Sequence, residues 1–307
     1  MDRQATELNQ LSRLLFDKAA AFWQYSIAAS FLASLVGIFA SMAALGLKEN
    51  ATLAAVAAVI LAISYYLRFS FEEIHGAAET MRRQSVLSEG LGWAIPRGQF
   101  NEWRQRAGSK ILKAIAANPR PDDYYETKSA KSAKRLAEMT FESVFWTKSL
   151  YRKMSSYLVT AMLAAVIISV GVLFVLPLLD LATTKRLFVV YFIYLAIPLF
   201  VSVDMLGLFL RLQRAISALT ALSPNIETLA NEQNPNSDQV LRLVAEYNCA
   251  LAAGLPIPKW VFARHHNEIV CAELTDARAN GVGDSGRSCR GLLRILVAAS
   301  LRGCECS

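Results

Sequence analysis

The chain has 307 residues, of which 54% are hydrophobic, and it carries a formal net charge of +7. Its mean hydropathy of +0.32 lies above that of ordinary soluble domains, which excludes a typical soluble protein and predicts an all-α membrane protein. The excess of basic residues fits either nucleic acid or a lipid surface, and its distribution along the chain, given below, favours the lipid bilayer over nucleic acid as partner.

Residues 1–18 are expected to form an amphipathic helix. Leu8, Leu11, Leu14 and Leu15 recur at intervals of three and four residues, which is the spacing of one helix face. The apolar face needs a partner, and three remain open: the membrane interface, a neighbouring subunit or the cytoplasmic domain.

Residues 19–68 are predicted to form the first transmembrane hairpin. The stretches 19–47 and 51–67 are apolar and long enough to cross a bilayer, and the link Lys48–Asn50 between them is so short that the chain must turn. Small residues recur in both stretches, so we expect these helices to pack on other helices of the same chain or of another subunit.

Residues 69–153 are predicted to form a basic, helical cytoplasmic domain. Helices are expected at about 70–88, 99–117 and 130–153, separated by segments rich in glycine and proline. The first should continue straight out of the second span and the last straight into the third.

Three basic pairs stand out in this domain, Arg82-Arg83, Lys134-Arg135 and Arg152-Lys153. The first two pairs are our candidate ligand-binding residues, because such a basic cluster suits a phosphorylated ligand. The alternative is that they attract anionic lipids of the inner leaflet and solvate their helices.

Residues 154–210 are predicted to form the second transmembrane hairpin. Residues 154–179 contain no charged side chain, and the stretch 187–210 is interrupted only by Asp204. Together with the first hairpin, this predicts four transmembrane helices in two hairpins.

Three residues of this hairpin are candidates for lining or gating a pore: Asp204, Pro198 and Pro177. A proline inside a spanning helix commonly kinks it, and a carboxylate in lipid should face a bundle interior or a wet cavity. The alternative for Asp204 is a position near the inner interface.

Residues 211–270 are predicted to form C-terminal cytoplasmic helices, at 215–223 and 237–253 around a polar loop, Ser223 to Ser237. The composition then changes, and residues 271–307 are expected to form a disordered or atypical tail.

The distribution of Lys and Arg predicts the topology. Of the 32 basic residues, 29 lie in the three large polar segments and three in the two short links. Because cytoplasmic segments carry the excess of Lys and Arg, we expect a multi-pass protein with both termini in the cytoplasm.

No catalytic motif is evident, neither a glycine-rich phosphate loop nor a GxSxG elbow nor an HExxH helix. We therefore expect a protein that is not an enzyme, with no catalytic residue, no cofactor and no metal site.

Several short motifs resemble one known family, the predicted pore-forming effectors with four transmembrane helices that accompany SMODS, or CBASS-like, nucleotide-signalled anti-phage systems. The resemblance covers roughly residues 5–270, and the motifs that carry it are Arg82-Arg83, Gly90–Trp93, Asp123–Tyr125, Glu142–Lys148, Tyr247, Pro256-x-Pro258-x-Trp260 and His265–Ile269. Family members continue on a last helix with an Asn and a Trp, where this chain has Cys271-Ala-Glu-Leu.

This resemblance implies an effector of the bacterial inner membrane that oligomerises and permeabilises the membrane during infection, as in abortive infection. It also implies a cyclic nucleotide second messenger as the activating partner, with a homo-oligomer as the acting form. The alternative from the residues alone is a membrane-anchored protein without a pore, whose cytoplasmic domain recruits a partner.

Overall fold

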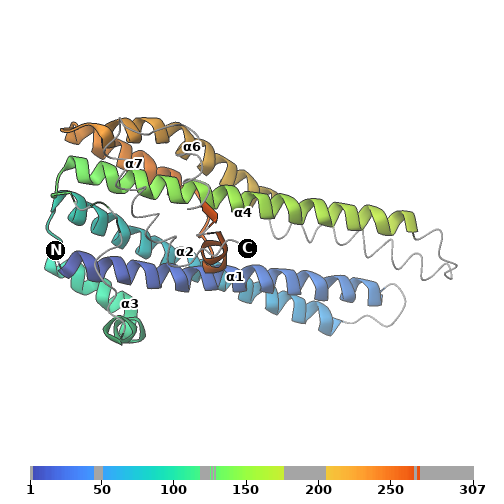
Figure 1. Cartoon of the computed structure of the whole chain (residues 1–307). Helices are drawn as coiled ribbons and strands as arrows, with labels where there is room; N and C mark the ends of the chain where they lie inside the picture. Colours follow the sequence, from blue (N-terminus) through green and yellow to red (C-terminus); the bar gives the residue numbers. More distant parts are fainter. Residues whose placement is uncertain are drawn as a thin grey trace. The chain divides into compact units, whose positions relative to one another are not determined.

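The computed structural model describes residues 3–44, 51–117, 125, 127, 129–175, 205–265 and 268–269. This part of the chain is helical and contains no strand, which confirms the expected all-α class for the described residues (Figure 1). The predicted pore residues Pro177, Pro198 and Asp204 lie outside the described residues, as does about half of the second predicted hairpin, residues 176–204.

Three helices are unusually long, with 42, 41 and 43 residues; they are α1 (Arg3–Ala44), α2 (Ala51–Leu91) and α4 (Ala133–Val175). Each combines an apolar stretch with an amphipathic stretch in one unbroken helix. The helices α2 and α4 are thus continuous across the two boundaries at which the sequence analysis joins polar helices to the second and third predicted spans. The shorter helices are α3 (Arg97–Ala117), α6 (Met205–Asn231) and α7 (Ser237–Ala253).

Three of the described helices, α1, α2 and α6, are long and apolar enough to cross a membrane. Large apolar side chains on these helices and on α4 lie exposed, where a soluble protein would bury them. Those of α4 include Leu163, Val166 and Ile167, which are 57%, 59% and 68% exposed. The helices therefore indicate a membrane protein.

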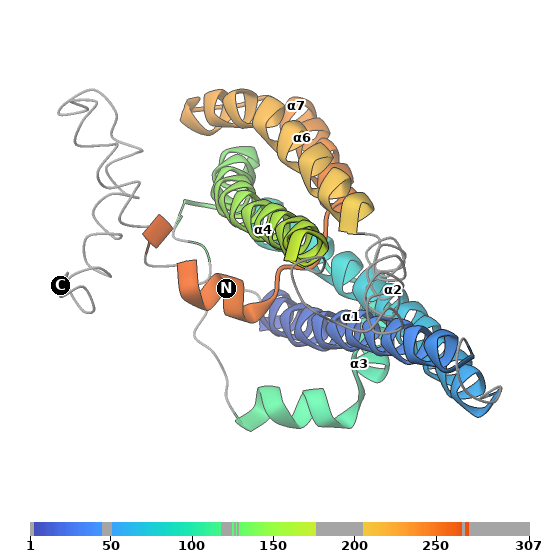
Figure 2. The ribbon, with the colours of Figure 1, turned by 90° about the vertical axis from the view of Figure 1, so that its right-hand side faces the viewer.

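The chain forms two compact units. Unit 1 comprises Met1–Leu14, Ala77–Met154 and Arg214–Ser307, and unit 2 comprises Leu15–Gly76 and Ser155–Gln213. Figure 2 shows the same ribbon turned by 90°.

In unit 2, hydroxyl groups join α1 to α2. Ser64 of α2 donates a hydrogen bond to the carbonyl oxygen of Ser26 at 2.8 Å, and its Oγ lies 2.6 Å from the Oγ of Ser30. Ser26 and Ser64 are buried. Small polar residues at this contact allow the two helices to approach closely, as the composition of the first hairpin predicts.

In unit 1, the amphipathic beginning of α1 packs inside the chain. Leu8 and Leu11 are fully buried, and Ser85 of α2 donates a hydrogen bond to the carbonyl oxygen of Ala5 at 3.0 Å. Of the three partners left open for this face, the structure therefore provides helices of unit 1 of the same chain.

The contact between α2 and α4 in unit 1 is close. A Cβ atom added to Gly90 would lie 2.9–3.1 Å from atoms of Leu136, including its Cα, so only glycine permits this approach. Gly92, with φ +77°, ends α2 in the left-handed conformation, and its N–H bonds the carbonyl of Ser88 at 3.0 Å. Leu136 and Ala137 then pack with Leu229, Ala230, Val240 and Val244 of α6 and α7.

The helix α6 differs from the sequence prediction, which placed a loop from Ser223 to Ser237. The helix continues through Pro224 to Asn231, and only residues 232–236 connect it to α7. The reason is burial: Leu219, Leu222, Ile226 and Leu229 form one buried stripe, whose packing outweighs the backbone hydrogen bond that Pro224 cannot make.

Candidate functional site

The most elaborate polar site in the described part of unit 1 is built around Arg82, one of the predicted ligand-binding residues. Its Nη2 lies 3.0 Å from Oε2 of Glu79, three residues earlier on α2, and donates to Oδ1 of Asn248 on α7 at 2.9 Å. Its guanidinium also lies over the ring of Tyr247, 5.6 Å from the centroid. Arg82 is therefore already neutralised and held by partners from its own chain.

Hydroxyl groups of α4 and α7 lie near this ion pair. Tyr247 is 4% exposed, and its hydroxyl lies 3.3 Å from that of Thr147 on α4. Tyr151, one turn further along α4, is also buried, and burial raises the pKa of its phenol so that it stays neutral. The site therefore combines an ion pair within α2 with neutral donors and acceptors from α4 and α7.

A cavity of about 10 Å³ opens beside this cluster and is lined by Arg82, Arg83, Val86, Thr140, Ser143, Val244, Tyr247 and Asn248. This space is about what one water molecule needs. Arg83 also lies near Glu79, with Nε 3.6 Å from Oε2, and its side chain is 40% exposed. The structure thus brings Arg82 and Arg83 to one cavity, but the cavity is far smaller than a nucleotide.

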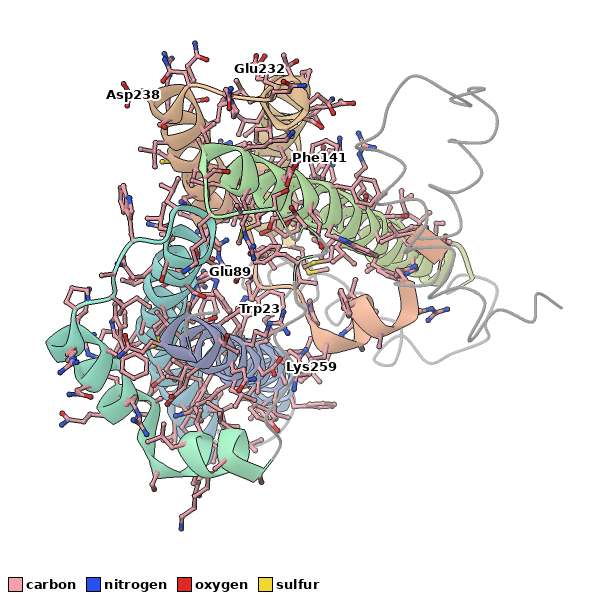
Figure 3. All side chains as sticks on the ribbon, turned by 60° about the vertical axis from the view of Figure 1, so that its left-hand side comes forward. Trp23, Glu89, Phe141, Glu232, Asp238 and Lys259 are labelled. Atoms are coloured by element: carbon pink, nitrogen blue, oxygen red, sulfur yellow. The ribbon has the colours of Figure 1, made fainter. Side chains whose placement is uncertain are left out.

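The other predicted pair, Lys134-Arg135, lies at the start of α4 and does not line this cavity. Nη2 of Arg135 lies 3.2 Å from Oε1 of Glu89 on α2, and its Nη1 donates to the carbonyl of Ser129 at 2.7 Å. Glu89, labelled in Figure 3, is 5% exposed. Arg135 therefore fastens α4 to α2, and Lys134 is half-exposed beside it.

Two more charged contacts in unit 1 involve Lys148 and Lys153, further along α4. Nζ of Lys148 donates to Oγ of Ser223 on α6 at 3.3 Å, and partial burial, with the neighbouring Arg152, lowers the pKa of Lys148. Lys153 forms an ion pair with Glu268, which also contacts Nδ1 of the buried His265. These hydrogen bonds, first that of Lys153 and then that of His265, lower the pKa of Glu268.

Sequence reasoning missed several members of this site. Glu79 was detectable, since a carboxylate three residues before an arginine on a helix is a standard ion-pair spacing. Asn248 gave no signal, because it comes from a helix 166 residues further along the chain.

Comparison of the chain with models of protein families, with curated proteins and with solved structures finds no match.

Proposed function

We propose that this protein is an effector of the bacterial inner membrane that permeabilises that membrane in a nucleotide-signalled anti-phage response. The observation that carries the proposal is the continuity of α2 and α4. Both extend from an apolar stretch into unit 1, where Arg135 and Glu89 join them. A change in the packing of unit 1 would therefore act directly on helices that the proposal places in the bilayer.

The buried cluster at Arg82 supports a signal-dependent change of this kind. Pockets for small ligands usually enclose roughly 300–1,000 Å³, whereas the space beside Arg82 and Arg83 is about 10 Å³. In the proposed mechanism, a cyclic nucleotide therefore separates α2 from α4 and α7 as it binds, and its phosphates take the place of Glu79 as the partner of Arg82 and Arg83. The acting form is a homo-oligomer, with Pro177, Pro198 and Asp204 along the path.

The test is conductance. The purified chain, reconstituted in liposomes, should release a trapped ion only after addition of the activating nucleotide, and Asp204→Asn should alter that conduction. In cells, co-expression with a SMODS nucleotidyltransferase should collapse the membrane potential on infection. A chain that never conducts, but still binds a protein partner from the cytoplasm, would instead support the membrane-anchored recruitment protein.

A further inference from the structure

The helix α3 consists of two halves with different surroundings. Gly108 interrupts it with φ +81° and ψ 162°, a conformation that favours glycine. The first half is anchored in unit 1: Phe100, Trp103 and Ala107 are buried, and Nε of Arg104 lies 3.2 Å from Oε1 of Glu7 on α1.

The second half, residues 109–117, has no such anchor. None of its residues is buried, and none of its side chains forms a hydrogen bond or ion pair with another described residue. In all three figures, no other described helix of unit 1 lies beside it. An isolated helix shorter than about 12–15 residues is marginal in water, so this half-helix needs a partner to stay folded.

The sequence of residues 109–117 indicates what kind of partner this half-helix would bind. At 100° per residue, Ile111, Leu112 and Ile115 fall on one face, and the exposed Lys110 and Lys113 fall on the other. Over the whole of α3 there are five basic residues and one acidic residue, Glu102, which pairs with Arg106. An apolar face combined with a cationic face is the pattern of a helix that lies in the surface of an anionic membrane.

We infer that residues 109–117 form an interfacial helix that docks on an anionic lipid surface. The face has two candidate occupants, lipid or a second copy of the chain, and charge favours anionic lipid because each copy of the chain carries a net charge of +7. Since the apolar helices α1, α2 and α6 keep the chain in a bilayer, lipid headgroups are present at high local concentration. The inference depends on membrane residence and not on the proposed pore.

The experiment measures amide hydrogen exchange of the full chain in nanodiscs of zwitterionic lipid alone or mixed with anionic lipid. Exchange of residues 109–117 should be slower in the anionic discs than in the zwitterionic discs. The double variant Lys110→Glu with Lys113→Glu should abolish this difference, because each lysine contributes about fivefold to the affinity for anionic lipid. High salt should also reduce the difference in exchange between the two kinds of disc. The control is Lys131→Glu with Arg264→Glu, which changes the net charge equally at two exposed positions outside α3 and should leave the difference intact.

Exchange of α7 in the same samples reports whether each variant is folded. Equal protection in both kinds of disc would show that protein covers the face, and concentration-dependent protection in detergent would identify a second copy; either result overturns the inference. Rapid exchange of residues 109–117 in both discs would overturn it as well, because the half-helix would then have no partner.

Discussion

The guanidinium of Arg82 donates to the side-chain oxygen of Asn248 over 2.9 Å and so joins α2 to α7 inside unit 1. The same Nη2 also donates to Oε2 of Glu79 on α2, so the guanidinium has one partner on its own helix and one on α7. A buried charge is tolerated only with such partners, so this cluster fixes how α2 and α7 pack.

Arg82→Met should destabilise the protein by about 3 kcal/mol, because it leaves the carboxylate of Glu79 buried with only the more distant Arg83 as counter-ion. The double variant Arg82→Met with Glu79→Met should recover much of that loss, since no unpaired charge remains. Denaturant unfolding in detergent, followed by circular dichroism, measures both.

A matched control is Arg242→Met. Arg242 pairs with Glu246 on the surface of α7, with side chains 81% and 43% exposed, so its loss should cost less than about 1 kcal/mol. If the double variant at Arg82 and Glu79 were no more stable than Arg82→Met, the loss of stability in Arg82→Met would not come from the unpaired carboxylate of Glu79.

Gly254→Ala should destabilise the end of α7 for a purely steric reason. The backbone of Gly254, with φ −79°, suits any residue, but an added Cβ would lie 2.2 Å from Oη of Tyr151. We expect a loss of about 1–3 kcal/mol, as for other overpacked cores, measured by thermal unfolding.

The control for this prediction is Gly76→Ala in α2, where nothing lies within 4 Å of the added Cβ. This change should be neutral or should stabilise the helix by up to about 1 kcal/mol. Combining Gly254→Ala with Tyr151→Phe removes the closest contact and should restore part of the lost stability; no restoration would argue against the clash with Tyr151.

The ion pair of Lys153 with Glu268 predicts an acid-labile attachment of the C-terminal segment to α4. The pKa of Glu268 is lower in the folded protein than in the unfolded chain, so its stabilising effect is complete above the ordinary carboxyl range. It is lost as the pH falls from about 4.5 through the lowered pKa of the folded state.

The hydrogen exchange of residues 258–265, measured as the pH is lowered and corrected for the intrinsic pH dependence of exchange, should therefore rise modestly in this window. Glu268→Gln should raise the exchange of this segment only modestly at neutral pH, because the pair is exposed and Val261 and His265 stay buried, and it should remove the transition. A transition of unchanged size in Glu268→Gln would assign it to another group.

The long helices were predictable because their cause is local. Neither α2 nor α4 contains a proline or a pair of adjacent glycines. The helical pattern of the apolar part of each helix therefore continues without a break into its amphipathic part. The break at Pro224 was predicted wrongly for the opposite reason: the packing that keeps α6 helical around Leu222 and Ile226 depends on neighbours distant in sequence.

The candidate ligand site, too, has features that the local sequence predicts and features that depend on residues distant in the sequence. The pairs Arg82-Arg83 and Lys134-Arg135 are conspicuous in the sequence, but their charge balance depends on Glu79 and Glu89, which share α2 with Arg82, and on the fold that brings α4 to α2. A basic pair in a sequence therefore indicates where charge is concentrated and leaves open whether it is available to a ligand.

The hydroxyl of Ser64 gives the sharpest test of the contact between α1 and α2 in unit 2. It donates to the carbonyl of Ser26 and also meets the hydroxyl of Ser30, so Ser64→Ala removes contacts between two helices in an apolar environment. Such contacts contribute about 0.6 kcal/mol on average and up to about 1.7 kcal/mol in membrane proteins, and we expect a loss in this range.

Ser64→Leu should cost considerably more, because its larger side chain would force α1 away from α2 where Ser26 and Ser64 are buried. Thr220→Ala is the control, since that exposed hydroxyl bonds only the carbonyl of Ile216 on its own helix. Unfolding in mixed micelles of detergent and denaturing surfactant measures all three variants. If Ser64→Leu were as stable as Ser64→Ala, the close approach of the two helices at this point would be wrong.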